Sequence, residues 1–311
     1  MHLEITGNGQ SSGSTVNCGY PQQGEDEAYS LQVPIVEQSH RAWLQAATVW
    51  GGLRALETFS QLVHEGDGGS SSHHLLINQT TVQDFPRFKY RGVLLDTARH
   101  YLPKKVLLAN LDAMSFNKMN VFHWHLVDDQ SFPFVSTRFP TIHAAGAYTR
   151  RHVYTPADVQ EVIEYARMRG IRVIPELDTP GHTHAMARAF PELLTPCYKN
   201  GVPYQPDFPH NSEMEILNPM RPQTFTFMRE LFAEFKGTFR DAFIHLGMDE
   251  VFYSCWRSSP EIARFMVAHN MSDYSQVEEF YVRRTLAEVK SLGYKVIIWQ
   301  DPVDNGVPVS L

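Results

Sequence analysis

Short apolar runs separated by helical patterns fill the chain from Arg91 onward. Each run is rich in β-branched or aromatic residues, which is typical of strands that are buried on both faces. The five runs cover residues 93–95, 121–127, 171–177, 243–246 and 296–299. Because buried strands here alternate with helices, the pattern predicts a parallel sheet covered by helices.

The segments between these runs carry apolar residues at helical spacing. They lie at residues 107–114, 155–170, 225–235 and 277–289. The second segment has clear end signals, because Thr155 can cap the helix, Pro156 suits its first position and Asp158 completes a capping box. Gly170 is the expected C-cap of the same helix.

The beginning of the chain has a different pattern. Tyr29, Leu31 and Val33 alternate with polar residues as in a half-buried strand, and apolar residues recur at helical spacing over 49–59. Pro86 interrupts regular pairing and marks a boundary. We therefore predict a partial α+β domain over residues 1–85 and a partial α/β domain over residues 86–311.

Composition and charge exclude several classes of protein. The chain has 311 residues, 43% of them hydrophobic, which suffices for a packed core. The formal charge of −7 argues against nucleic acid or an anionic membrane as the main partner. No apolar stretch is long enough to span a bilayer, and the first residues lack the pattern of a signal peptide.

Polar residues follow each of the five predicted strands. In a parallel α/β fold the carboxyl ends of the strands meet at one edge, where such enzymes hold their active sites. We therefore expect these side chains to lie close together. They include Asp96, Arg99, His123, His125, Asp128, Asp129, Glu176, Asp178, His182, His245, Asp249, Glu250, Trp299 and Asp301.

The fourth strand ends in two adjacent carboxyls, Asp249 and Glu250. Two neighbouring carboxyls can take different roles, because one can be a proton donor while the other stays charged. The alternative is an acidic dipeptide at a helix start with no catalytic role.

His123 and His125 lie on one face of the second predicted strand. Such a pair can ligate a divalent metal in a barrel hydrolase, or it can hold carboxylates such as Asp129 and Glu176 by hydrogen bonds. Trp124, Tyr101 and Trp299 could stack on a sugar ring or belong to the core. Arg99 could hold adjacent hydroxyls or form a surface ion pair.

Five motifs in order make the sequence resemble glycoside hydrolase family 20. They are "RGVLLDTARHYLP" (91–103), "NVFHWHLVDDQ" (120–130), "IRVIPELDTPGH" (171–182), "HLGMDEV" (245–251) and, in the first domain, "VWGGLRALETFSQLV" (49–63). The resemblance implies a (β/α)8 barrel of the TIM type, of which about five strands are present, preceded by a small α+β domain. It also implies release of terminal non-reducing N-acetylhexosamine from β-linked glycans. No cofactor and no metal are implied.

The resemblance also assigns roles in a substrate-assisted, retaining mechanism, in which the acetamido oxygen of the sugar is the nucleophile. Glu250 would be the general acid and base, and Asp249 would hold the acetamido N–H. Arg99 would bind sugar hydroxyls, Asp128 and His182 would position Glu250, and Trp299 would line the acetamido pocket. Met248 stands where the family has glycine, which puts the local turn in question.

The resemblance implies a longer parent protein, truncated here at both ends. Cys197 and Cys255 match positions that form a disulfide in the family, and Cys18 matches a cysteine whose partner lies upstream. Asn78 and Asn270 stand in glycosylation sequons. Together these features favour a secretory-pathway origin. The resemblance implies a lysosomal or secreted parent that acts on glycans, glycoconjugates or chito-oligosaccharides and can form a homo- or heterodimer. The competing hypotheses are an inactive or sugar-binding remnant and, with less support, the metal-dependent barrel hydrolase.

Overall fold

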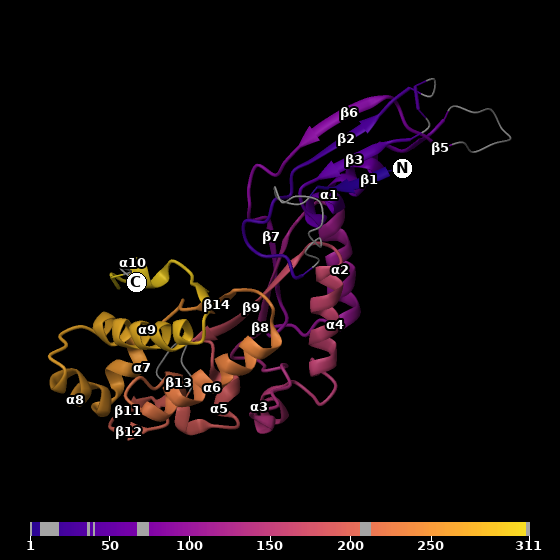
Figure 1. The fold of residues 1–311 in the computed structure, drawn as a ribbon. Coiled ribbons are helices and arrows are strands. Elements are labelled where there is room, and N and C mark those ends of the chain that lie inside the picture. Colours follow the sequence, from indigo (N-terminus) through magenta and orange to yellow (C-terminus); the bar gives the residue numbers. More distant parts are fainter. Residues whose placement is uncertain are drawn as a thin grey trace. The chain divides into compact units, whose positions relative to one another are not determined.

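The computed structural model describes residues 2–6, 19–35, 38–39, 41–66, 75–205 and 213–308, so Cys18 lies outside the described residues. The chain forms two compact units, each assembled from separate segments (Figure 1). Unit 1 comprises Met1–Val93, Leu108–Phe122 and Glu164–Arg172, and unit 2 comprises Leu94–Leu107, His123–Ile163 and Val173–Leu311.

Unit 1 contains a four-stranded sheet in the order β1-β3-β2-β6. Its strands are β1 (His2–Ile5), β2 (Tyr29–Val33), β3 (Trp43–Ala46) and β6 (Thr80–Asp84). Helix α1 (Val49–Leu62) begins where the side chain of Thr48 accepts the N–H of Gly51, a capping bond that satisfies one of the first free donors of the helix. Two short strands, β4 (His64–Glu65) and β5 (Leu75–Leu76), form a separate antiparallel pair.

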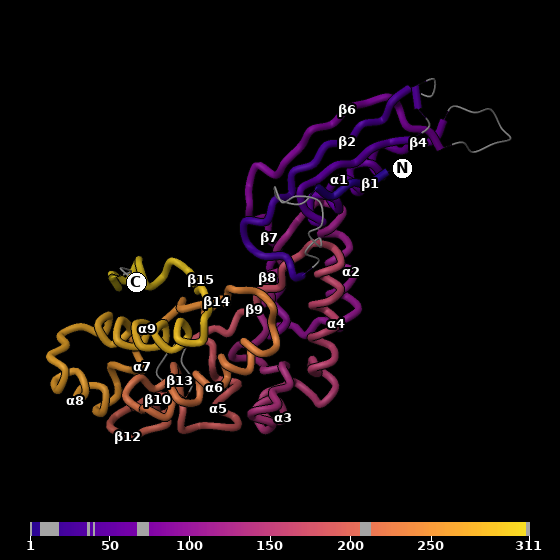
Figure 2. The backbone as a smooth tube through the Cα atoms, viewed as in Figure 1, coloured from indigo at the N-terminus to yellow at the C-terminus, as the bar shows by residue number. Residues whose placement is uncertain are grey.

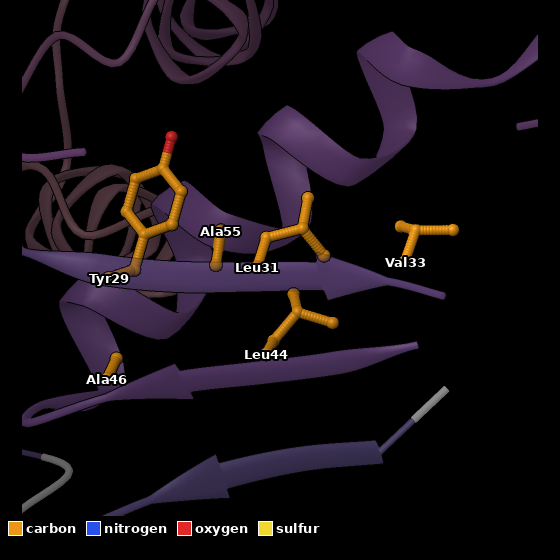
Figure 3. Packing of buried hydrophobic residues seen from close by; sticks show 6 residues of the cluster. All are labelled: Tyr29, Leu31, Val33, Leu44, Ala46 and Ala55. Atoms are coloured by element: carbon orange, nitrogen blue, oxygen red, sulfur yellow. The ribbon is translucent and has the colours of Figure 1, made fainter. Parts of the chain in front are cut away.

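The alternation predicted for β2 gives unit 1 its core. Tyr29, Leu31 and Val33 lie on one face of the strand and pack with Leu44 and with Ala55 of α1 (Figure 3). A one-residue shift in register would expose this whole set, so the burial of one face fixes the pairing.

Unit 2 is built on a parallel sheet in the order β15-β14-β9-β8-β7, so that each strand neighbours the next one of the sheet in the sequence. The strands are β7 (Gly92–Asp96), β8 (Val121–Val127), β9 (Arg172–Thr179), β14 (Phe243–Gly247) and β15 (Lys295–Ile297). All residues of β8 and β9 are buried, as expected for strands covered on both faces. The expected α/β class, with five parallel strands and a small α+β unit before them, is confirmed.

Helices connect the strands of this sheet. The principal ones are α2 (Lys104–Phe116), α4 (Pro156–Arg167), α6 (Pro222–Thr238) and α9 (Tyr274–Ser291). Figure 2 shows α9 beside β15, on which it packs. The capping box predicted for α4 is present, because Thr155 N–H donates to Asp158 and Asp158 N–H donates to the Thr155 hydroxyl. Gly170 has the positive φ of 65° that was expected after this helix.

Smaller elements fill the connections. They are α3 (Pro140–Gly146), α5 (His184–Ala187), the 3-10 turn η1 (Pro191–Leu193), β10 (Leu194–Pro196), β11 (Tyr198–Lys199), β12 (Val202–Pro203), β13 (Met214–Leu217), α7 (Tyr253–Ser258), α8 (Pro260–Ala268) and α10 (Asp301–Asp304). A disulfide joins Cys197 to Cys255, which confirms the expected pairing and ties the β10–β11 segment to α7. None of the helices in the described part of the chain has the length and apolar character that a bilayer crossing requires.

The fifth predicted strand ends earlier than expected. The fifth run was expected to be a strand as far as Trp299, but β15 ends at Ile297. The chain turns there towards α10, which begins at Asp301. Trp299 lies two residues beyond the end of β15, and its backbone N–H still donates to the carbonyl oxygen of Gly247 on the neighbouring strand, at 2.8 Å.

Candidate active site

Glu176 of β9 is the centre of a buried cluster of imidazoles. Its side chain is fully buried, and ring nitrogens of His123, His125 and His245 lie 2.6, 2.9 and 3.3 Å from its oxygens. The indole N–H of Trp299 also donates to it, at 3.2 Å. Although burial opposes the charge, these hydrogen bonds lower the pKa of Glu176 far below its usual range. The cluster therefore has a permanently ionised carboxylate at its centre.

Asp128, which follows β8, extends this network. It receives His125 Nε2 at 2.7 Å, Arg99 Nε at 2.9 Å and His182 Nδ1 at 3.3 Å. Burial opposes its charge, but the hydrogen bonds from His125 and His182 lower the pKa of Asp128 to about 2. Burial likewise opposes protonation of His125, but its bonds to Asp128 and Glu176 raise the pKa of this histidine to about 9.

His182 connects Asp128 to three further carboxyls. Its Nδ1 faces Asp128, while Nε2 lies 3.5 Å from Glu250, 3.8 Å from Asp249 and 3.9 Å from Asp178. Burial opposes the charged imidazole, but the contact with Asp128 raises the pKa of His182. A protonated imidazole at this point offsets the mutual repulsion of the acids around it.

The acid pair lies in a loop of unusual backbone conformation after β14. Gly247, Met248 and Glu250 have φ values of 64°, 72° and 51°, which residues other than glycine rarely adopt. Such strain persists where surrounding contacts hold the chain in place. The loop leaves Glu250 with 57% of its side chain exposed and Asp249 with 22%, so the more accessible acid is Glu250.

Asp178 is buried beneath this loop. Its Oδ1 accepts the N–H of Met248 at 3.2 Å, and a Cβ on Gly247 would lie only 1.7 Å from the same oxygen. Burial and the neighbouring charges of Asp249 and Glu176 raise the pKa of Asp178 well above its usual range. The protonated Asp178 can then donate to the Asp249 carboxyl, whose buried Oδ1 has no hydrogen-bond partner in the described part of the chain.

A cavity of about 90 Å³ opens beside the acid loop. Glu250 and His182 line it, together with Phe252, whose side chain is about half exposed. The remaining lining residues are Asp129, Gly181, His184, Glu215 and Ile216. Glu250 can therefore reach a molecule that enters from this side.

Several groups of buried ligating atoms could hold a metal ion. His123, Glu176 and His245 form such a trio, with one ligand atom of each within 4.8 Å of the others. The same atoms already pair with one another, since the short contacts of His123 and His245 are made to Glu176. The geometry thus serves a hydrogen-bonded network without requiring an ion.

The structure brings together most of the residues singled out from the sequence. Arg99, Asp128, His182, Asp249 and Glu250 form one continuous chain of polar contacts. Trp299 joins it through Glu176, with its ring 4.5 Å from that of His245.

Two aromatic candidates lie elsewhere. Trp124 is fully buried and packs edge-on against Tyr154, so it belongs to the core. Tyr101 stacks on the same tyrosine and donates to the carbonyl oxygen of Val153.

Asp178 belongs to the site although the sequence alone assigned it no role. The available signal was its position, two residues after Glu176 on the same strand face.

These polar side chains converge at the carboxyl ends of parallel strands, where enzymes of this fold class hold their active sites. The family model for the catalytic domain of glycosyl hydrolase family 20 matches residues 88–310, and a model described as beta-acetyl hexosaminidase like matches residues 3–62. The chain belongs to glycosyl hydrolase family 20.

The curated proteins that this chain resembles include β-hexosaminidase subunits. The chain is 46% identical over 292 residues to the beta subunit of Mus musculus, covering 93% of this chain and 51% of the mouse protein. It is 44% identical to the alpha subunit of Bos taurus, covering 93% of this chain and 52% of that subunit. The chain thus spans about half the length of these curated relatives.

Solved structures give the same result. A chitobiase from Flavobacterium johnsoniae is 31% identical, with a TM-score of 0.79 over 93% of this chain and 42% of its own. An exo-β-N-acetylglucosaminidase from Vibrio harveyi is 25% identical, with a TM-score of 0.75 over 88% of this chain and 44% of its own.

Proposed function

We propose that the protein hydrolyses terminal non-reducing N-acetylhexosamine residues from β-linked glycans by a substrate-assisted, retaining mechanism. The observation that carries the proposal is the convergence on His182. One ring nitrogen faces the Arg99–Asp128 pair, and the other faces both Asp249 and Glu250. We assign the hydroxyl-binding cation to Arg99, the anion to Asp249 and the proton donor to Glu250, and their approach to one imidazole supports this assignment.

Glu250 begins the reaction as the acid. The acetamido oxygen of the sugar attacks the anomeric carbon, the bond to the leaving oxygen breaks, and that oxygen takes the proton of Glu250. Water then attacks the anomeric carbon of the oxazolinium ion, the bond from that carbon to the acetamido oxygen breaks, and the water gives a proton back to Glu250. The two inversions at the anomeric carbon sum to retention. The accessible side chain of Glu250 suits proton exchange with both the leaving group and water.

Asp249 acts on the other side of the anomeric carbon. As a carboxylate it accepts the acetamido N–H and stabilises the positive charge that develops on the oxazolinium. A protonated Asp178 can hold the Asp249 carboxyl in place by donating to it. Arg99, kept in place by Asp96 at 2.9 Å and by Asp128, presents its guanidinium to sugar hydroxyls.

The dependence on the acetamido group provides the test. We expect the chain to release 4-methylumbelliferone from the β-N-acetylglucosaminide and to leave the β-glucoside, which lacks the acetamido group, intact. Asp249→Asn should lower turnover of the first substrate at least tenfold. Equal hydrolysis of both sugars would contradict substrate assistance. Loss of activity on treatment with EDTA, with recovery on adding Zn²⁺, would favour a metal-dependent hydrolase instead.

We further propose that the protein matures in the secretory pathway, for a lysosomal or secreted destination. Its disulfide and the exposed side chains of Asn78 and Asn270, each in a sequon, support this. Digestion with an N-glycosidase should reduce the mass of protein made in animal cells, and Asn78→Gln with Asn270→Gln should abolish the shift. Unchanged mass on digestion would contradict glycosylation at these positions.

The relatives are named as subunits, so we also propose that the full-length protein forms a homo- or heterodimer. Sedimentation velocity of the full-length protein checks this, and a monomer at micromolar concentration would contradict it.

A further inference from the structure

Glu278 of α9 is a buried acid that the proposed mechanism leaves without a role. Its side chain is fully buried, and it forms no ion pair with a lysine, arginine or histidine among the described residues. Burial raises the pKa of Glu278, which favours the uncharged acid. A buried carboxyl without a cation costs stability, so its position calls for an explanation.

The contacts of Glu278 lead to the acid loop from two directions. Its Oε2 accepts a short hydrogen bond from the hydroxyl of Tyr253 and another, at 3.3 Å, from the side-chain amide of Asn305. Tyr253 is three residues after Glu250 and opens α7. Asn305 directly follows α10, whose first residue, Asp301, accepts the N–H of Glu250 at 3.3 Å.

The intervening segment is also fixed. The ring of Tyr253 stacks on that of Trp256 at 5.9 Å, and Val251 is buried in the same apolar cluster as Trp256. Thus Glu278 holds both the chain that leaves Glu250 and the short helix that binds the backbone of Glu250. The positive φ of Glu250 needs such support, because a residue other than glycine would otherwise leave this conformation.

We propose that Glu278 is a positioning residue that holds the Glu250 carboxyl where it can protonate the leaving oxygen. It does so through Tyr253 on one side and through Asn305 and α10 on the other. The proposal rests on the proposed function, since it assigns Glu278 to the acid step of that reaction. It does not give Glu278 any contact with the substrate.

Leaving-group dependence distinguishes this role from a general effect on the fold. A good leaving group such as 2,4-dinitrophenolate departs without a proton, whereas a sugar alkoxide needs one. We expect Glu278→Leu to lower kcat at least tenfold on chitobiose and less than about threefold on 2,4-dinitrophenyl N-acetylglucosaminide, with KM changed less than about threefold on both. Glu278→Gln, which keeps the shape and an acceptor oxygen, should stay within about threefold of the unsubstituted chain on both substrates.

Thr285→Val is the matched control, because Thr285 is buried on the same helix and its hydroxyl has no hydrogen-bond partner within the described residues. It should leave both rates unchanged.

If Glu278→Leu does not fold, Tyr253→Phe removes only one of the two bonds to Glu278 and should show the same preference for the good leaving group. Equal losses on both substrates, or no loss on chitobiose, would overturn the inference while leaving the proposed function intact. If the unsubstituted chain hydrolyses neither substrate, the proposed function fails, and the inference with it.

Discussion

At the scale of single residues, the contact between Gly247 and Asp178 decides the geometry of the acid loop. The backbone of Gly247 has a positive φ and approaches the Asp178 carboxyl so closely that no Cβ fits between them. Met248, next in the chain, tolerates a φ of 72° with its side chain fully buried. The turn therefore accommodates methionine where the family has glycine, but it has no room for a side chain one residue earlier.

Gly247→Ala tests this contact. A Cβ 1.7 Å from an Asp178 oxygen must displace that carboxyl or the loop, so we expect a fall of at least tenfold in kcat and a loss of about 2 kcal/mol or more in the free energy of unfolding. Gly237→Ala makes the same change within α6, where the added Cβ meets no atom within 4 Å, and should stabilise the protein by about 1 kcal/mol. Urea unfolding and turnover assays measure both, and equal behaviour of the two variants would contradict the account.

At the scale of elements, the disulfide anchors the helix that follows the acid loop. Cys255 lies in the middle of α7 and Cys197 lies just after β10, 58 residues apart in sequence. A cross-link over a loop of this length removes much of the freedom of the unfolded chain.

Replacing both cysteines by alanine should lower the free energy of unfolding by about 2–4 kcal/mol. Urea unfolding of the variant and of the unsubstituted chain, with and without reductant, gives the comparison. Reductant should lower the stability of the unsubstituted chain to that of the variant and leave the variant unchanged. A reductant effect of similar size on both would show that the cross-link is not its source.

The elements that the sequence predicted well are those with one strong signal. Strands β8 and β9 are rich in apolar residues and buried along their whole length, and α4 has both a capping box and a terminal glycine, so propensity and burial agree. The pairing of β10 with β13 had no such signal, because both strands are short and 17 residues separate them. Likewise, the site residues could be found from their positions after strands. The raised pKa of Asp178 could not be predicted from the sequence, because it depends on charges that only the fold brings together.

At the scale of the whole molecule, the buried network couples the stability of unit 2 to pH. The pKa of His125 is raised from 6.5 to about 9, so its ion pairs stabilise the fold fully below pH 6.5 and less as pH rises through 9. The pKa of Asp128 is lowered from 3.8 to about 2, so its contribution is complete above about pH 4 and is lost as pH falls towards 2.

We therefore expect the difference in Tm between the unsubstituted chain and His125→Gln to be largest below pH 6.5 and to shrink towards pH 9. The corresponding difference for Asp128→Asn should shrink as pH falls from about 4 to 2. His269→Gln, the same substitution at an exposed position after α8, is the matched control. Thermal melts followed by circular dichroism across pH 2–9 provide the measurement. A His125→Gln difference that grows between pH 6.5 and 9 would contradict the assignment.

We assign Glu250 as the proton donor to the leaving group. Turnover by Glu250→Gln tests this assignment directly. With chitobiose as substrate, the account predicts that kcat/KM falls by about 10²–10⁴, the usual contribution of a general acid. Glu192→Gln, the same change at an exposed position in η1, should leave it unaltered. Hydrolysis by Glu250→Gln at the rate of the unsubstituted chain would contradict the account.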